Sequence, residues 1–136
     1  MKTSRVTQKF GAHLSVAGGL HLAFDEALQV GCDCLQVFVK NQRQWVAKPL
    51  TDEQARLFKE ARKKSGVSPV VAHASYLLNL ASPEKANRDK SRDALIDELQ
   101  RCEALGIEGL VIHPGAHMGS GINAGECKYS VYYCPT

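Results

Sequence analysis

The sequence predicts an α/β fold in which short strands alternate with longer helices around a parallel sheet. Short β-rich runs alternate with segments of helical periodicity, and four such units follow one another, the last represented by its strand. With 136 residues, 44% of them hydrophobic, the chain is long enough for one compact domain and too short for two. We therefore expect one domain, or part of one.

The first unit pairs a short strand with an amphipathic helix. Phe10 to Ala12 is the expected strand, and the helix after it ends at Gly31, where a left-handed residue belongs. Apolar residues recur at helical spacing and are expected to form the buried stripe of this helix: Leu20, Ala23, Phe24, Ala27 and Leu28.

The second unit carries the clearest helix start in the chain. Residues 34–39 form the expected strand, and Thr51 and Gln54 then have the spacing of a capping box. The helix is expected to end at Gly66. Its buried stripe is predicted to be Ala55, Phe58 and Ala61.

The third unit begins with a strand over residues 69–72. Ser82 and Pro83 read as the N-cap and first residue of the next helix, which should end at Gly106. Its predicted stripe is Leu95, Leu99 and Cys102.

In the fourth unit, residues 109–112 are continuously apolar, which suits a strand in a sheet covered on both faces.

The segment after Gly119 has neither helical nor strand period and is rich in Gly, Tyr and Cys. We therefore divide the chain into residues 1–121, which carry the repeating units, and a divergent tail, residues 122–136.

Histidines and one mixed polar loop follow the predicted strands. His13, the loop 40–45, His73 with Tyr76, and His113 each come directly after a strand. In parallel α/β barrels and open sheets the carboxyl ends of the strands carry the chemistry, so these residues should share one rim. Barrel closure takes eight strands and about 250 residues, so four units indicate either a small open sheet or a partial barrel.

The histidines suggest a transition metal. Neutral imidazole is a good ligand for Zn²⁺, which takes three or four protein ligands, and His73 and His113 are the best pair. The alternative for each is a hydrogen-bonded histidine near a strand end. His117 lies four residues after His113, but Pro114 and Gly115 exclude a helix between them, so we place His117 outside the ligand set.

The loop from Lys40 to Trp45 combines cationic, amide and aromatic side chains. Such a combination of side chains can bind phosphates and stack in a gap between bases. The alternative is an ordinary polar loop with one packed Trp. The net charge of +3 permits binding to nucleic acid without arguing for it.

Composition favours an intracellular protein. No apolar stretch approaches the roughly 20 residues that span a membrane, and the N-terminus lacks the apolar core of a signal peptide. Five cysteines, an odd number without repeated spacing, are expected to be free thiols in a reducing compartment. Cys32 and Cys34 form a C-x-C pair, but a buried thiol is commoner than a metal ligand in such a strand.

Several motifs follow the predicted strands and helices in a distinctive order and spacing. They are Gly11 to Ser15 with Gly18 to Leu20, Lys40 to Trp45, His73 to Leu77, Lys90 to Arg92, and His113 to Gly115. Together these motifs resemble the endonuclease IV family. The resemblance covers roughly residues 10–121, and the Asn-Gln-Arg-Gln-Trp loop is its most specific part.

The resemblance implies a TIM (β/α)8 barrel, of which this chain supplies about the first four βα units as a partial barrel. It implies a DNA-repair enzyme with three zinc ions that hydrolyses the phosphodiester 5′ to an abasic site in double-stranded DNA by means of zinc-bound hydroxide. His73 and His113 match zinc ligands of the family. The residues that match DNA-contacting or rim positions are Arg43, Tyr76, Gln42, Asn41 and His13.

The chain departs from the family pattern in two respects. Ala74 stands where bacterial members often carry Asp, which weakens the case for a carboxylate partner of the first ligand. The family's other zinc ligands lie in the second half of the barrel, so we expect this chain to hold at most one zinc, weakly. Unpaired strand edges also predict self-association.

Three functions therefore remain open at the level of sequence. The first is the repair nuclease. The second is a truncated, inactive fragment with residual DNA binding, and the third is a sugar isomerase or epimerase built on the same barrel. For the nuclease we expect a nuclear or mitochondrial location in a eukaryote and a cytoplasmic one in a bacterium.

Overall fold

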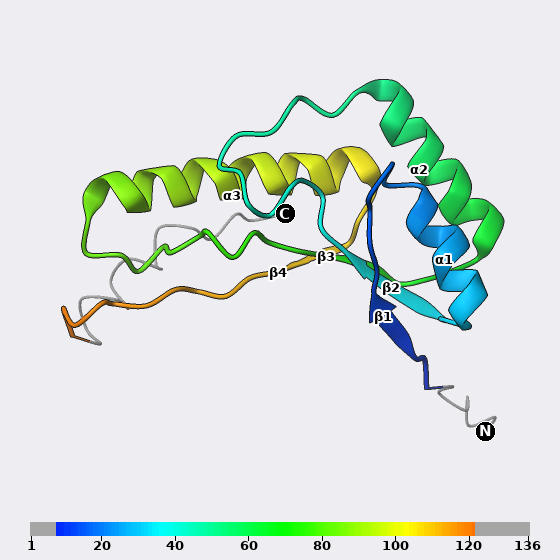
Figure 1. Ribbon diagram of the computed structural model, residues 1–136, viewed down its shortest axis with the longest axis horizontal. Helices are drawn as coiled ribbons and strands as arrows, with labels where there is room; N and C mark the ends of the chain where they lie inside the picture. Colours follow the sequence, from blue (N-terminus) through cyan, green and yellow to red (C-terminus); the bar gives the residue numbers. More distant parts are fainter. Residues whose placement is uncertain (1–7, 122–136) are drawn as a thin grey trace, which may run out of the picture.

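The computed structural model describes residues 8–121, which form a parallel sheet flanked by helices (Figure 1). The predicted alternation of strands and helices is confirmed. In chain order the elements are β1 (Gly11–His13), α1 (Leu22–Val30), β2 (Cys34–Val37), α2 (Asp52–Ser65), β3 (Val70–His73), α3 (Lys85–Leu105) and β4 (Gly109–Val111).

The four strands stand side by side in the order of the sequence. β1 pairs with β2, β2 with β3 and β3 with β4, and every pair is parallel. The helices lie along one side of this sheet (Figure 1). Because parallel strands point the same way, all four carboxyl ends meet at one edge, as the sequence predicts.

The hydrophobic core fills the space between the helices and the sheet. Leu35 and Val37 of β2 alternate with more exposed neighbours and face the helices. Phe24 of α1 and Phe58 of α2 pack edge to face, with ring centroids 4.9 Å apart, against this layer. Val70 and Ala72 of β3 complete this core, and Leu110 of β4 packs against it.

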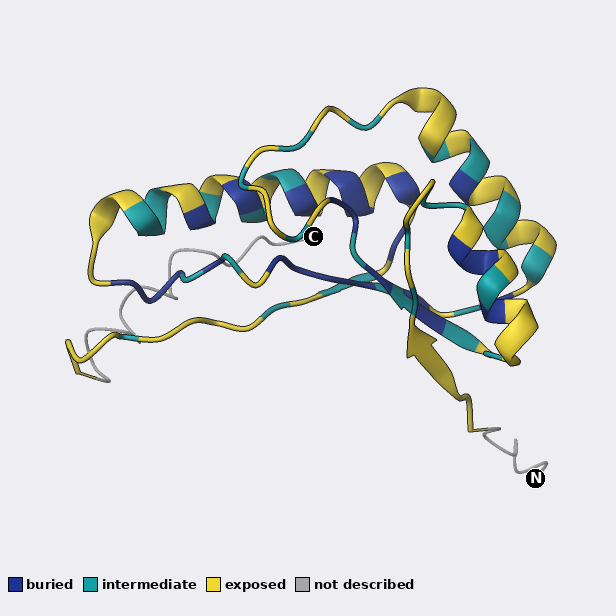
Figure 2. Ribbon diagram, viewed as in Figure 1, coloured by how far each residue is buried: buried dark blue, intermediate teal, exposed yellow. Residues whose placement is uncertain are grey.

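The opposite face of the sheet is open in the described part of the chain. All of β1 is exposed (Figure 2), and Val111 of β4 is 44% exposed. The expectation that β4 is covered on both faces is therefore wrong for residues 8–121. Continuous apolar sequence indicates that a strand has two apolar faces, but it does not say what covers the second.

The ends of the first two helices agree with the sequence. Gly31 and Gly66 adopt left-handed conformations with φ of 75° and 72°. Thr51 and Gln54 form both hydrogen bonds of the capping box. Phe58 is buried as predicted, with Ala55 and Ala61 partly buried around it, whereas Leu28 of α1 is 55% exposed, contrary to its predicted place in the stripe.

The start of the third helix was predicted two residues too early. α3 begins at Lys85 with Glu84 as its N-cap. The hydroxyl of Ser82 instead accepts a hydrogen bond from the Glu84 N–H, and Arg88 donates to the carbonyls of Ser82 and Pro83. These contacts form a turn ahead of the helix, a local use of Ser and Pro that competes with the cap.

The buried stripe of α3 is also different from the predicted one. Leu99 is 43% exposed and Leu95 is half-buried, although Cys102 is buried as expected. Half of the buried face is polar, and its residues are Ser91, Ala94, Glu98, Arg101, Cys102 and Leu105. A search for apolar periodicity cannot find a stripe that is buried by ion pairs and hydrogen bonds.

No helix between residues 8 and 121 combines the length and the apolarity that a membrane span requires.

Candidate functional site at the strand ends

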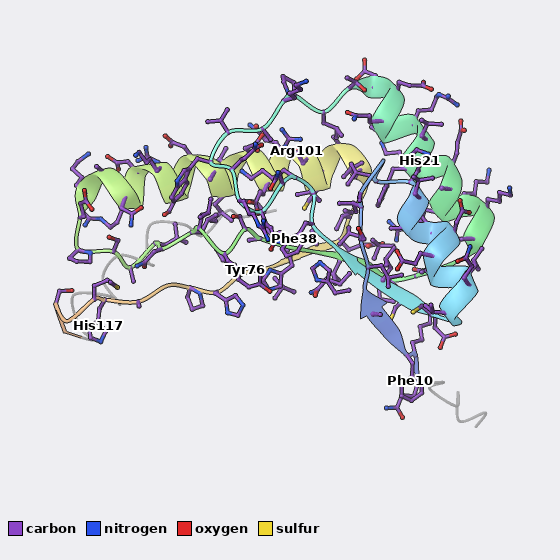
Figure 3. The ribbon with its side chains drawn as sticks, viewed as in Figure 1. Phe10, His21, Phe38, Tyr76, Arg101 and His117 are labelled. Carbon is purple, nitrogen blue, oxygen red and sulfur yellow. The ribbon has the colours of Figure 1, made fainter. Side chains whose placement is uncertain are left out.

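Five aromatic side chains gather where the strands end. His13 closes β1 and His73 closes β3, while Phe38, Tyr76 and His113 lie just after β2, β3 and β4. The His73 ring lies 5.1 Å from those of both His113 and Tyr76, and Tyr76 stacks on His113 at 5.6 Å. Phe38 lies beside them, with its ring centroid 4.4 Å from that of His13 and 5.9 Å from that of Tyr76 (Figure 3). We call these five residues the ring cluster.

The hydrogen bonds of two imidazoles set their tautomers. His73 Nδ1 lies 2.7 Å from the carbonyl oxygen of Ala74, which can only accept, so Nδ1 carries a proton, and in the neutral tautomer Nε2 is the nitrogen with the free lone pair. His13 Nδ1 pairs with Gln36 Oε1 at 2.9 Å in the same manner. The backbone carbonyl of Ala74 thus orients the His73 ring. The Ala74 side chain cannot do so because it has no carboxylate.

His73 and His113 fit a shared metal ion as two of its ligands. Zn–N bonds are about 2.0–2.1 Å long, so one ion can reach two rings whose centroids lie 5.1 Å apart. Between residues 8 and 121 there is no group of three or more His, Cys, Asp or Glu placed to hold a metal. His117 lies away from the ring cluster (Figure 3), and its Nδ1 accepts the N–H groups of Gly119 and Gly121.

The loop after β2 is a tight polar turn beside the ring cluster. Asn41 Oδ1 accepts the N–H of Arg43 at 2.9 Å, which leaves the exposed Arg43 at the tip of the turn. The hydroxyl of Ser75, from the loop after β3, donates to the carbonyl of Gln42 at 2.7 Å. The predicted DNA-contacting residues of these two loops are therefore brought together by the fold.

Lys40 does not lie at the surface with the other residues of this loop, although the sequence predicts a loop that binds phosphates. Its side chain is 2% exposed, and Nζ lies 3.2 Å from Asp97 Oδ2 and 3.5 Å from Glu98 Oε1. It also donates to the carbonyls of Trp45 and Ala94. A charge this deeply buried acts on the structure rather than on a ligand.

Three residues of α3 that the sequence did not single out complete this network. Asp97 accepts from Lys40 and from Arg101, and Arg101 donates to the carbonyl of Lys48 at 2.7 Å. Both carboxylate oxygens of Glu98 accept the Ser75 N–H. The spacing of Asp97 and Arg101, four residues apart in a helix, was a signal for an ion pair, but nothing in it indicated burial against Lys40.

The two carboxylates respond to this environment in opposite directions. Partial burial opposes ionisation of Asp97, but hydrogen bonds from Arg101 and Lys40 outweigh it and lower the pKa of Asp97 below 3.8. For Glu98 burial dominates and raises the pKa above 4.5, although the Ser75 N–H and Lys40 pull it down.

We expect Glu98→Gln to alter how stability depends on pH. Because the folded-state pKa of Glu98 is raised, its ionisation costs folding free energy above that pKa, and the cost disappears as the pH falls toward 4.5. The stability of the variant relative to the wild type should therefore decrease between pH 7 and pH 4.5. Urea unfolding of both proteins at several pH values checks this, and a difference independent of pH would contradict it.

Comparison with known proteins places these features in a family. The family model described as xylose isomerase-like TIM barrel matches residues 24–131. This match runs into residues 122–136, which lie outside the described residues, so the boundary expected at 121 stays a prediction. A parallel sheet of four strands with its helices corresponds to part of such a barrel.

Relatives and solved structures agree with one another. The chain is 47% identical over 126 residues to a probable endonuclease 4 of Chloroflexus aurantiacus, covering 93% of this chain and 44% of the relative. It is 50% identical over 113 residues to one of Phocaeicola vulgatus, covering 82% and 41%. The crystal structure of endonuclease IV from Thermus thermophilus matches with a TM-score of 0.77 and 36% identity, covering 89% and 45%. The chain thus spans less than half the length of these proteins.

A sugar-modifying enzyme shares the architecture at much lower identity. The structure of an E. coli 3-keto-D-glucoside 4-epimerase matches with a TM-score of 0.68 at 14% identity, covering 92% of this chain and 49% of that one. This likeness concerns the fold alone.

Proposed function

Because this chain belongs to the endonuclease IV family of xylose isomerase-like TIM barrels, we propose that its ring cluster is part of a zinc-dependent DNA-repair site. The proposed reaction is hydrolysis of the phosphodiester 5′ to an abasic site in double-stranded DNA. The observation that carries the proposal is the convergence of His73, His113 and Tyr76, whose ring centroids lie 5.1 to 5.6 Å apart on the rim of the sheet.

His73 and His113 would hold a zinc ion through ring nitrogens, and His73 Nε2 already has the required tautomer. Bound there, zinc supplies positive charge that stabilises a phosphodiester as charge develops on its oxygens. Two imidazoles are fewer than the three or four ligands of a stable zinc site, so residues 8–121 by themselves account for one weakly held ion at most.

Tyr76 and Arg43 suit the DNA side of such a site. Tyr76 is 62% exposed and backed by Phe38 and His113, so its ring can enter the gap that a missing base leaves. The cation of Arg43 can contact phosphate or stack in the same gap. We place Asn41, Gln42 and His13 as further contacts along the same rim.

A second candidate function is binding of damaged DNA without incision. Its support is that the described residues present two converging imidazoles but no third metal ligand beside them. The epimerase alternative has only the fold in its favour. A polar loop with an exposed Arg, hydrogen-bonded to the loop that carries an exposed Tyr, fits a base stack better than a monosaccharide.

Incision of a duplex containing one abasic site tests the proposed reaction. We expect cleavage 5′ to the lesion by the 136-residue chain with added zinc, and its loss both with a chelator and in His73→Ala. Preference for the abasic duplex without any cleavage would favour the binding function instead. Cleavage that survives in His73→Ala would show that a contaminating nuclease is responsible.

The role of Tyr76 can be tested with a matched pair of variants. Tyr76 and Phe10 are exposed to similar extents, 62% and 66%, but Phe10 lies before β1, away from the ring cluster (Figure 3). Stacking of a base on an aromatic ring is worth about 1–3 kcal/mol, so Tyr76→Ala should weaken binding to an abasic duplex at least about fivefold. Phe10→Ala should leave binding unchanged in the same titration, and equal effects would count against the stacking role.

Two further expectations belong with this function. Cys32, Cys34 and Cys102 are free thiols in the described part, which supports an intracellular, reducing location. The open sheet face and the edges of β1 and β4 support self-association of the partial barrel. Sedimentation of the purified chain over a range of concentrations tests the latter.

A further inference from the structure

Ser75 occupies a junction between three elements. It is 5% exposed and lies between His73 and Tyr76 in the loop after β3. Its N–H donates to both carboxylate oxygens of Glu98 in α3, at 3.2 Å each. Its hydroxyl donates to the Gln42 carbonyl at 2.7 Å and accepts the Leu77 N–H at 3.2 Å. Ser75 is therefore bonded to α3 through its N–H and to the loop after β2 through its hydroxyl.

The hydroxyl of Ser75 joins the two loops that carry the proposed DNA contacts. Gln42 immediately precedes Arg43, and the bond to Leu77 closes a turn whose tip is Tyr76. One oxygen atom thus fixes the position of the Arg43 backbone relative to the Tyr76 backbone. Both bonds are part-buried, and removing the hydroxyl takes a partner from the Gln42 carbonyl and from the Leu77 N–H.

Glu98 and Lys40 anchor this junction to α3. Lys40 Nζ contacts Glu98 at 3.5 Å and the carbonyl of Trp45, so the far end of the same loop is held by the same group of charges. The side chains of Lys40 and Glu98 are 2% and 1% exposed. A buried network with every member bonded rigidifies the segments that it joins.

We propose that Ser75, held by Glu98 and Lys40, is a positioning residue that fixes the Arg43 loop relative to Tyr76 for recognition of an abasic site. The choice of an abasic site as the ligand rests on the proposed function. The link between the two loops does not depend on it. Without the Ser75 hydroxyl, the two loops should move independently, and simultaneous contact of Arg43 and Tyr76 with one lesion should become less favourable.

Ser65 provides a matched control for Ser75. Its hydroxyl donates to the Arg62 carbonyl and accepts the Val67 N–H, the same two kinds of hydrogen bond, at the end of α2. Ser65→Ala and Ser75→Ala therefore remove equivalent bonds at opposite ends of β3. Glu98→Gln serves as a second variant if Ser75→Ala does not fold, because it keeps the shape of the side chain and one oxygen acceptor.

Two measurements on the full chain test the proposal. The first is the ratio of affinities for a duplex with a stable abasic analogue and an intact duplex. We expect Ser75→Ala to lower this ratio about fivefold, the loss that corresponds to one hydrogen bond, and Ser65→Ala to leave it unchanged. The second is acrylamide quenching of Trp45, the single Trp of the sequence, which should increase in Ser75→Ala only.

The outcomes separate the two proposals. If the wild type prefers the abasic duplex and the two Ala variants behave alike, the positioning role is overturned while the proposed function stands. If the wild type binds the abasic and the intact duplex equally well, the proposed function fails. Quenching of Trp45 then remains as the test of the link between the two loops. Greater quenching in Ser75→Ala than in Ser65→Ala then supports the link, and equal quenching overturns it.

Discussion

Lys40→Met should lower the free energy of unfolding by about 3–5 kcal/mol, the usual cost of removing one partner from a buried ion pair. Met fills most of the space of the Lys stem, so packing changes little. The loss arises because Glu98, 1% exposed, would keep a buried negative charge beside Asp97 without the cation between them. Two hydrogen bonds to the carbonyls of Trp45 and Ala94 are lost as well. Urea unfolding followed by circular dichroism measures the change.

The same substitution at the surface provides the control. Lys85 pairs with Asp89 at 2.5 Å, but its side chain is 79% exposed, and solvent screens such pairs. Lys85→Met should therefore unfold at the same urea concentration as the wild type. If Lys40→Met also unfolded at the urea concentration of the wild type, Glu98 would have to be protonated without cost in the folded variant. The network would then not be held by ionic contacts.

His113→Ala should weaken zinc binding by about 10- to 100-fold or more. Loss of a partner that merely orients a ligand already costs about this much, and a ligand itself contributes at least as much. His113 is exposed, so its removal should not disturb the core, in contrast to removal of His73, which is 8% exposed. Competition with a chromophoric zinc chelator measures the affinity.

His21→Ala is the matched control for this experiment. His21 precedes α1, makes no side-chain capping bond and lies away from the ring cluster (Figure 3). Its removal should leave the zinc affinity of the wild type unchanged. Equal loss in both variants would mean that the histidines bind zinc nonspecifically, and no loss in either would exclude His113 from the site.

Local sequence signals predicted the fold well where one segment decides its own structure. The capping box at Thr51 and the left-handed Gly31 and Gly66 depend on neighbours within one turn, and the structure confirms all three. The signal failed at Ser82, because a turn made with Arg88 and Asn79 uses the groups that a helix cap would need. Competing local hydrogen bonds of similar strength cannot be ranked from sequence.

The candidate site was predictable to the extent that it follows from strand direction. His13, His73 and His113 were expected on one rim because parallel strands end at one edge, and the structure places His73 between the other two. Their metal and DNA roles stay predictions. Phe38, whose ring contacts those of His13, His73 and Tyr76, was missed because an apolar ring after a strand carries no chemical signal of its own.

The sequence by itself determined the parallel βα order, the family and the edge of the sheet on which the polar residues gather, because period, caps and motifs are local. Only the tertiary structure decided that Lys40 is buried and that α3 buries three polar side chains. Those facts depend on residues more than fifty positions apart, such as Lys40 and Asp97, meeting across the core. The free energy of burying a charge is set by the partners that it finds there, and no local pattern encodes them.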